Sequence, residues 1–403
     1  MTTKIPYTTN LTYALLYALV VTGLSMLSDG CHVFLKTENT LYDPIQRILA
    51  IDHADNWRVE RFQPTLDQLH FIPLDSNYID MNCNRVKRDS LAILLRTLAN
   101  ANQEATIFLD YDFEPLDTTD NKLLLGKDSL LYESMLSLGE RLVIISDTTG
   151  NTIFTNNWKT RGTNKNTTKI PKNGGIELKI FEDEGKIRYV NLGLEKTKED
   201  AFIEILLKLT KGKSLSQLKL PEEIEINYFI RNNRPIGRRP VLNTTQASEV
   251  VHTQANAIFA KSTQLIFIGA FHKLINKYSQ TFDYFDTPIR GLNGIYINLN
   301  AYLNVATNTY IQRAPEWLIF VVNFLLAFGG SGYYHFVAAK KQVHYVKPTS
   351  WLRRELCFSL LIFVLLIGSL FYWYYMKFPF VWTLLFFVMN QSIYHFLSKK
   401  IKK

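Results

Sequence analysis

QLIFIGAF, residues 264–271, is a short apolar run that gives way to the polar residues HKLINKYSQ. Apolar runs of about four to eight residues predict buried strands. Three other runs have the same character: Arg47–Asp52 (RILAID), Ala105–Asp110 (ATIFLD) and Arg141–Ser146 (RLVIIS). Segments with helical spacing separate them: Val86–Ala101, Asp128–Gly139, Asp200–Leu209, Thr244–Lys261 and, beyond the last strand, Gly294–Val305. Strands that alternate with helices predict an α/β domain with a largely parallel sheet.

An antiparallel addition to this sheet is also predicted. Ile176–Ile180 and Ile187–Asn191 flank an acidic turn, Glu182-Asp183-Glu184-Gly185, which is typical of a hairpin. Glu223–Phe229 (EIEINYF) alternates polar and apolar residues as a strand does. We therefore expect a mixed sheet in which parallel pairs dominate.

Long uncharged stretches occur at both ends of the chain. About twenty apolar residues are enough to cross a bilayer as a helix. We therefore expect one N-terminal and three C-terminal transmembrane helices, at residues 11–28, 317–338, 356–376 and 378–397. The segment between the first and second of them, residues 29–315, is long enough to fold around a core of its own.

The basic residues predict an orientation for these four helices. Lysines and arginines gather between the second and third spans and in the C-terminal tail. Because basic loops stay in the cytoplasm, the loop 339–355 and the tail 398–403 are expected there, as are residues 1–10. Residues 29–315 are then periplasmic, and the chain is expected to be a multi-pass protein of a bacterial inner membrane, with membrane lipid around it.

The net charge of +9 is a property of the ends of the chain. Of 45 basic and 36 acidic residues, 11 basic and 2 acidic ones lie outside residues 29–315, which leaves 34 of each sign within that segment. A segment without net charge gives no indication of a nucleic-acid partner, and we expect none.

Two aspartates follow the apolar run ATIFL, in the order Asp110-Tyr111-Asp112. Such a pair can hold a divalent metal against a nucleotide-sugar, because hard cations prefer oxygen ligands. A metal-dependent enzyme that resembles a DxD glycosyltransferase is therefore one alternative. The other is an acidic strand end that faces a cleft or solvent. The predicted periplasmic location favours the second alternative, so we expect no metal.

Further aspartates lie where ligands gather in α/β proteins. Asp52 ends RILAID, while Asp283 and Asp286 belong to FDYFDTPIRG, residues 282–291. Ligands bind beyond the carboxyl ends of parallel strands, so these aspartates, with Asp110 and Asp112, are candidates to line one crevice. Each of them can instead cap a helix or stabilise a turn. Thr287-Pro288 predicts an extended turn in this loop.

Recognised catalytic motifs are absent from the sequence. There is no G-x-S-x-G, P-loop or H-E-x-x-H motif, and the eight histidines show no metal-binding spacing. We therefore expect neither enzymatic activity nor a cofactor. Whether Cys31 and Cys83 pair is left open.

Several short motifs resemble those of one sensory family. They are Ile268-Gly269-Ala270, Asp283-x-x-x-Thr287-Pro288, Gly294-Ile295-Tyr296, Asn298-Leu299-Asn300-Ala301, ILAID (48–52), IFLDYDF (107–113) and INYF (226–229). In this order, and with the expected spans, the chain resembles the second type of CHASE domain, an extracellular sensory domain of bacterial signalling proteins. Asn298 stands where that family usually has a histidine, so a function that needs an imidazole there is in doubt.

The resemblance implies a sensor whose periplasmic domain binds an unidentified ligand or partner. Because no output domain follows the last span, signal transduction is expected to proceed through a separate protein partner or a homo-oligomer. A non-switching scaffold protein is the main alternative, and the metal-dependent enzyme the third. The candidates for ligand binding or for shaping the loop are Asp52, Asp110, Asp112, Asp283, Asp286, Thr287 and Asn298.

Overall fold

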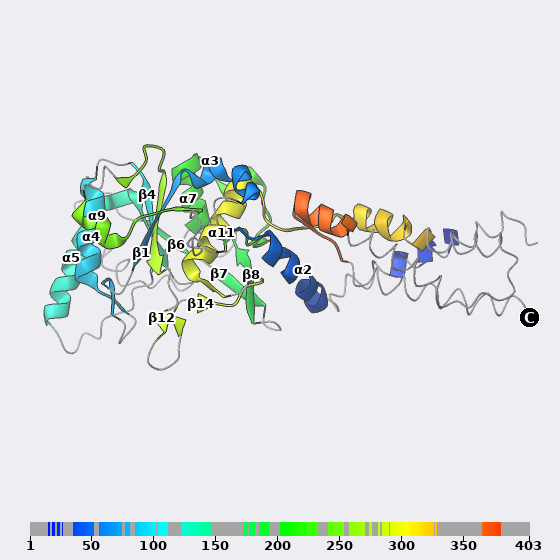
Figure 1. The fold of residues 1–403 in the computed structure, drawn as a ribbon, viewed down its shortest axis with the longest axis horizontal. Helices are drawn as coiled ribbons and strands as arrows, with labels where there is room; N and C mark the ends of the chain where they lie inside the picture. The colour runs from blue at the N-terminus through cyan, green and yellow to red at the C-terminus, as the bar shows by residue number, and fades with distance from the viewer. Residues whose placement is uncertain are drawn as a thin grey trace, which may run out of the picture. The chain divides into compact units, whose positions relative to one another are not determined.

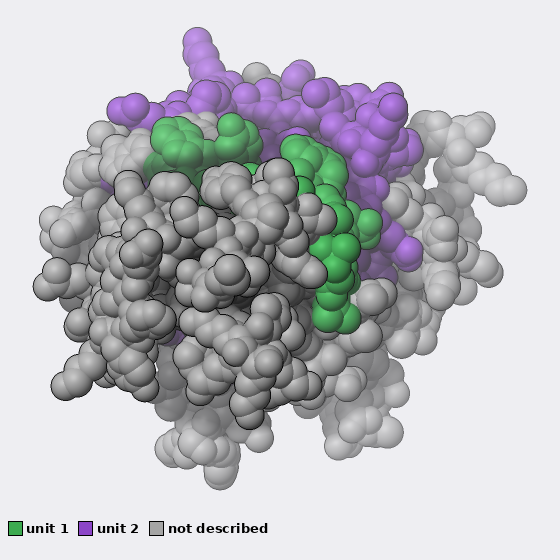
Figure 2. All heavy atoms as spheres, turned by 90° about the vertical axis from the view of Figure 1, so that its right-hand side faces the viewer, with its two compact units in different colours: residues 1–45, 311–403 green, residues 46–310 purple. Residues whose placement is uncertain are grey.

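A computed structural model gives the fold of the chain (Figure 1). It describes parts of residues 15–26 and then residues 35–51, 56–74, 77–80, 85–101, 104–111, 122–146, 172–175, 177–181, 185–192, 202–231, 241–253, 258–270, 274–275, 281–282, 284–289, 291–325, 327–328 and 365–379. The chain divides into two compact units (Figure 2). Unit 1 comprises Met1–Ile45 and Ile311–Lys403, and unit 2 is Gln46–Tyr310.

A six-stranded parallel sheet forms the centre of unit 2. Its strands are β1 (Leu69–Leu74), β4 (Thr106–Asp110), β5 (Leu142–Ser146), β6 (Lys172–Gly175), β10 (Asn243–Thr244) and β11 (Leu265–Ala270). They lie in the order β10-β1-β11-β4-β5-β6, and each neighbouring pair is parallel. The prediction of an α/β domain with a largely parallel sheet is therefore confirmed, and QLIFIGAF supplies β11, a central strand.

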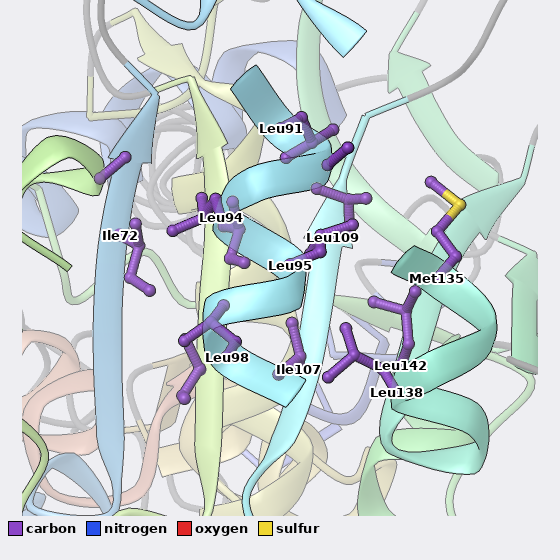
Figure 3. Close-up of a cluster of buried hydrophobic side chains, with 14 of the residues drawn as sticks. Ile72, Leu91, Leu94, Leu95, Leu98, Ile107, Leu109, Met135, Leu138 and Leu142 are labelled. Carbon is purple, nitrogen blue, oxygen red and sulfur yellow. The ribbon is translucent and has the colours of Figure 1, made fainter. Parts of the chain in front are cut away.

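One face of the sheet is covered by α4 (Arg88–Asn100), α5 (Lys122–Leu138) and α9 (Ala247–His252). Every second residue of the strands points to this face, among them Ile107 and Leu109 of β4. Figure 3 shows these two side chains beside Leu94 and Leu95 of α4. These buried aliphatic side chains belong to one continuous core, whose burial is the main force that holds these helices on the sheet.

The helices α7 (Phe202–Lys211) and α11 (Gly294–Thr307) lie over the opposite face (Figure 1). That face carries a row of aromatic side chains. Phe71, Phe267 and Phe108 occupy one row across three neighbouring strands. Their ring centroids are 5.1 and 5.2 Å apart, and Phe202 of α7 packs on Phe108 at 5.2 Å. This row fixes the distance between the sheet and the helices that cover it.

The strand β1 was not predicted, because Pro73 lies within it. Proline lacks the N–H that a central strand needs, so it argues against such a strand. The carbonyl of Phe71 accepts a hydrogen bond from the backbone N–H of Thr245, on the side of β10. Residues two apart point to the same neighbour, so the nitrogen of Pro73 faces the side on which β10 has already ended at Thr244. No ladder hydrogen bond is lost there.

A second, three-stranded sheet is formed by strands that follow β6 in the sequence. β7 (Glu177–Phe181) pairs antiparallel with β8 (Lys186–Asn191), and β8 pairs antiparallel with β9 (Glu223–Glu225). The predicted hairpin is therefore confirmed, but it belongs to a separate sheet, so the prediction that it adds antiparallel strands to the main sheet is wrong. The predicted strand 223–229 is confirmed only for its first three residues.

One other predicted element is wrong. RILAID is not a strand, because α2 runs from Leu35 to Leu49, and only Ile51 forms a bridge, with Ile230. The predicted helix 244–261 is confirmed in part, as α9, while Thr244 belongs to β10. Smaller elements complete the described part of unit 2: η1 (Trp57–Arg61), α3 (Gln63–Leu66), η2 (Gly139–Arg141), α8 (Leu215–Leu218), β2 (Ile79–Asp80) with β3 (Arg85–Val86), β12 (Leu274–Ile275) with β13 (Thr281–Phe282), and β14 (Tyr284–Phe285) with β15 (Leu292–Asn293).

Unit 1 joins the two ends of the chain. β16 (Gln312–Arg313) pairs in parallel with β17 (Met376–Lys377). The hydroxyl of Tyr42 donates to the carbonyl of Phe378 at 3.0 Å and accepts from the N–H of the same residue at 2.8 Å. The ammonium of Lys377 donates to the side chain of Asn39. These contacts are buried, so they fix this part of α2 against residues 376–378.

The four predicted transmembrane helices are contradicted. In the part of the chain that the structure describes, no helix combines the length and the apolar character needed to cross a membrane. The predicted multi-pass inner-membrane location is wrong on the same finding.

Several predicted segments fall outside the described residues. They are 1–10, 339–355, 380–397 and 398–403. The predicted domain 29–315 stays a prediction, and the division of the chain into compact units places boundaries instead at Gln46 and Tyr310.

Candidate functional site

Asp110 and Asn298 meet at the carboxyl edge of the parallel sheet. Asp110 is the last residue of β4, and Asn298 lies in the first half of α11. The amide Nδ2 of Asn298 donates a hydrogen bond of 2.9 Å to Oδ1 of Asp110. The two residues are 188 positions apart in the sequence, so their contact is a product of the fold rather than of local structure.

Gly269 allows this approach of helix and sheet. In the register of the sheet, Gly269 of β11 lies beside Asp110 on one side and Pro73 on the other. A Cβ atom at Gly269 would lie 2.6 Å from Cδ1 of Ile295 and 3.2 Å from Cβ of Asp110. The first distance is well below van der Waals contact, so a side chain at this position would force the side chain of Ile295, or α11 with it, to shift.

The helices that follow β4 and β11 cover opposite faces of the sheet. α5 follows β4 and covers the same face as α4, whereas α11 follows β11 and covers the opposite face (Figure 1). Where neighbouring parallel strands lead to opposite faces, their loops separate and leave a crevice in which ligands bind. Asp110 is the last residue of β4, and Gly269, its partner on β11, is followed by one more strand residue, Ala270.

Two oxygen atoms of the pair have no hydrogen-bond partner among the described residues. They are Oδ2 of Asp110 and Oδ1 of Asn298, and both atoms are buried. The side chain of Asn298 is buried as a whole, at 2% exposure, whereas Asp110 keeps part of its surface exposed. A buried polar atom without a partner costs about 1–3 kcal/mol, so such atoms are usually satisfied by a partner in the working protein.

Burial also changes the acidity of Asp110. Removal of the carboxyl group from water raises its pKa from 3.8 to about 7, and the hydrogen bond from Asn298 opposes this rise. A neutral carboxyl is favoured by burial because the charged form loses its hydration. Near neutral pH this group therefore exists in both protonation states, and it can accept hydrogen bonds in one and also donate in the other.

The other side of α11 holds an extended segment of backbone. Nδ2 and Oδ1 of Asn300 bond to the carbonyl and the N–H of Ile230, at 2.9 Å each. Asn304, one turn later, bonds in the same way to Asn227, at 2.9 and 2.8 Å. Each asparagine side chain thus makes the two hydrogen bonds that a residue of a neighbouring strand would make with the backbone. The helix α11 therefore links the Asp110 contact rigidly to residues 227–230.

The remaining predicted site residues are not brought to this pair by the described structure. Asp286 is exposed, and its backbone carbonyl accepts from the N–H of Ile187 at 2.9 Å. Thr287 is buried, and the carbonyl of Pro288 accepts from Nε of Arg47 at 3.0 Å. This part of the loop has a structural role. Asp52, Asp112 and Asp283 lie outside the described residues.

His70 and the described acidic side chains do not form a metal site. His70 is buried on β1, where Nε2 lies 2.9 Å from the hydroxyl of Thr245, and burial lowers its pKa to about 4. A neutral imidazole that is bonded to a hydroxyl has a structural role in the core. Within the described residues, no three histidine, cysteine or acidic side chains gather as a metal site would require.

Sequence reasoning missed the roles of Asn300, Asn304 and Gly269. The available signal was the spacing of Asn300 and Asn304, which places two amides on one side of an otherwise apolar helix. For Gly269 the signal was a glycine within a strand, which often marks the close approach of another backbone.

Comparisons with protein-family models, with curated proteins and with solved structures gave no match to this chain. The resemblance to the second type of CHASE domain therefore stays a prediction.

Proposed function

We propose that unit 2 is the ligand-binding domain of a signalling protein and that its ligand lies against Asp110 and Asn298. One observation carries this proposal: two buried oxygen atoms, on side chains that touch each other, lack partners among the described residues at the strand edge where α/β domains bind ligands. A ligand that fills these hydrogen bonds removes the cost of leaving them unmade.

The position of α11 supports a sensory role. Asn298 contacts Asp110, while Asn300 and Asn304 hold residues 227–230 on the other side of the same helix. A ligand that draws Asn298 closer to β4 also moves Asn300 and Asn304, because a helix moves as a rigid element. Such a ligand shifts the equilibrium between two positions of α11 only by its difference in affinity for them.

The proposal contains no catalytic step. Binding requires only that the two oxygen atoms exchange hydrogen bonds with a ligand, and the signal then passes to a separate protein partner. A scaffold protein, the alternative, would have a fixed partner and would show no ligand-dependent change in stability.

Thermal unfolding of the full chain tests this function. The panel contains amines, amino acids, sugars, nucleosides and carboxylic acids, each at pH 6.0 and 8.5. We expect at least one class to raise the melting temperature of the wild type and to lose this effect in Asn298→Leu. Asn304→Leu is the matched control, because it removes an asparagine from the same helix but not from the site. A shift that persists in Asn298→Leu would place binding elsewhere, and no shift from any class would remove the support for a sensor.

A further inference from the structure

We infer that the ligand presents a cationic N–H group, such as a primary ammonium, to Oδ2 of Asp110 and Oδ1 of Asn298. This inference rests on the proposed function and names the chemical class of its ligand. It follows from the hydrogen bonds that these two oxygen atoms can accept, from the charge of the site and from the uncharged residues near Asp110.

Both free atoms act as hydrogen-bond acceptors. An ionised carboxylate has acceptor oxygens only, and the oxygen of an asparagine amide is also an acceptor. The amide nitrogen of Asn298 is already used, because it donates to Oδ1 of Asp110. A ligand that satisfies both oxygen atoms must therefore supply at least two donors, and an ammonium group has three.

Charge favours a cation over a neutral donor. Gly269 of β11 lies beside Asp110, Pro73 of β1 lies on the other side of Gly269, and the helix residue above Gly269 is Ile295. None of these three residues carries a charge. A buried carboxylate without a counter-charge is costly, whereas hydrogen bonds between opposite charges are stronger than neutral ones. An anionic ligand would add a second negative charge to this edge.

The direction of the pH dependence follows from the same geometry. In the empty site the Asp110 carboxyl has a pKa of about 7 because it is buried. A cation binds the ionised form and so competes with the proton, which makes its affinity rise as the pH increases through 7. A ligand that accepts a hydrogen bond from the protonated carboxyl would bind more weakly as the pH rises.

The test compares two cations of the same charge on the full chain. Methylammonium chloride has three N–H donors, whereas tetramethylammonium chloride has none. At pH 8.5 and about 0.3 M of either salt, we expect methylammonium alone to raise the melting temperature of the wild type, by about 1 °C or more if its dissociation constant is near this concentration. The shift is expected to be smaller at pH 6.0.

Variants and a third salt decide the outcome. Asn298→Leu is expected to lose the methylammonium shift, and Asn304→Leu to keep it. Equal shifts from the two cations, or a shift that persists in Asn298→Leu, would overturn the inference. A larger effect of magnesium chloride that requires Asp110 would also overturn it, since this indicates a metal site.

If only neutral or acidic compounds of the panel bind through Asn298, the ligand class is wrong but the sensor proposal stands. If no compound binds through Asn298, both fail.

Discussion

The pKa of Asp110 departs strongly from its value in water, and this departure makes a prediction about stability. Its pKa is about 7 in the folded chain and near 4 in the unfolded chain. Between these values the folded state binds more protons, so the free energy of unfolding falls as the pH rises from about 4 to about 7.

Asp110→Asn should remove most of this pH dependence. The amide of asparagine has the shape of the carboxyl and stays neutral at every pH, so the variant should be more stable than the wild type at pH 8, by at least about 1 kcal/mol. Urea unfolding at pH 5 and pH 8 measures the difference. Asp286→Asn, which removes the same charge from an exposed position, is the control. A wild type and an Asp110→Asn variant with parallel pH profiles would contradict the burial of this carboxyl.

Gly269 provides a steric prediction at the same scale. Gly269→Ala should destabilise unit 2 by about 1–3 kcal/mol, because the new Cβ lies 2.6 Å from Cδ1 of Ile295. Ile295→Val removes Cδ1, so the double variant Gly269→Ala/Ile295→Val should be less destabilised than the two single changes predict together. A double-mutant cycle of unfolding free energies measures this coupling. Gly368→Ala, where nothing lies within 4 Å of the new Cβ, is the control.

Independent, additive effects of the two substitutions would show that α11 does not pack on β11 at Gly269. The predicted contact would then be wrong, and the approach of Asn298 to Asp110 would lose its explanation.

At the scale of elements, α11 behaves as a buried connector between the site and an extended segment. Its residues from Gly294 to Val305 are all buried, yet it contains polar asparagines because their amides satisfy backbone groups. Asn304→Leu should cost about 2–4 kcal/mol, since it leaves the N–H and the carbonyl of Asn227 without these partners.

Hydrogen exchange locates this effect. Asn304→Leu should increase the exchange rate of the Asn227 amide, and Asn300→Leu that of the Ile230 amide. Asn298→Leu should leave both amides protected, because its contact lies on the other side of the helix. Unchanged protection of Asn227 in Asn304→Leu would show that the side chain does not hold this segment.

The elements also show what the sequence could and could not predict. ATIFLD and QLIFIGAF were predicted as strands because each contains an unbroken apolar run. Both predictions are confirmed, since both segments form central strands of the sheet. RILAID has a similar composition but continues a helix, since Arg47 to Leu49 complete α2. A short apolar run does not distinguish these cases. The strand LHFIPL was not predicted. It can contain Pro73 because its neighbour β10 ends at Thr244, so no strand residue lies opposite the proline nitrogen.

The site itself was predicted in part. Asp110 and Asn298 were both named as candidates, Asp110 from its position after a strand and Asn298 from the motif resemblance. Their contact could not be predicted, because it depends on the register that places Gly269 beside Asp110. Asp286 and Thr287 have the composition of a binding loop, but the structure shows an exposed carboxyl and a buried turn.

At the scale of the whole molecule, the chain consists of an α/β unit and a second unit built from both ends of the chain. The apolar runs at these ends predicted four membrane spans, and this prediction is contradicted, because no helix among the described residues has the length and apolar character of a span. The function proposed for unit 2 depends on the site and not on the location of the chain.

A ligand that acts through α11 should change exchange rates beyond the site. With the strongest compound of the panel bound, we expect slower exchange at Asn227 and Ile230, because Asn304 and Asn300 hold these amides to the same helix. Hydrogen exchange with mass spectrometry of the full chain measures this change. The segment containing the Leu94 amide of α4, on the opposite face of the sheet, serves as the internal control. Slower exchange at both places would indicate general stabilisation rather than a signal carried by α11.

The most direct test of the proposed site is a ¹³C NMR titration of the Asp110 side-chain carboxyl in the full chain, with the resonance assigned from Asp110→Asn. The account predicts a midpoint at about pH 7, which moves to lower pH in methylammonium chloride and stays in place in tetramethylammonium chloride. A midpoint near pH 4 that neither salt changes would contradict both the burial of this carboxyl and its role as the binding group.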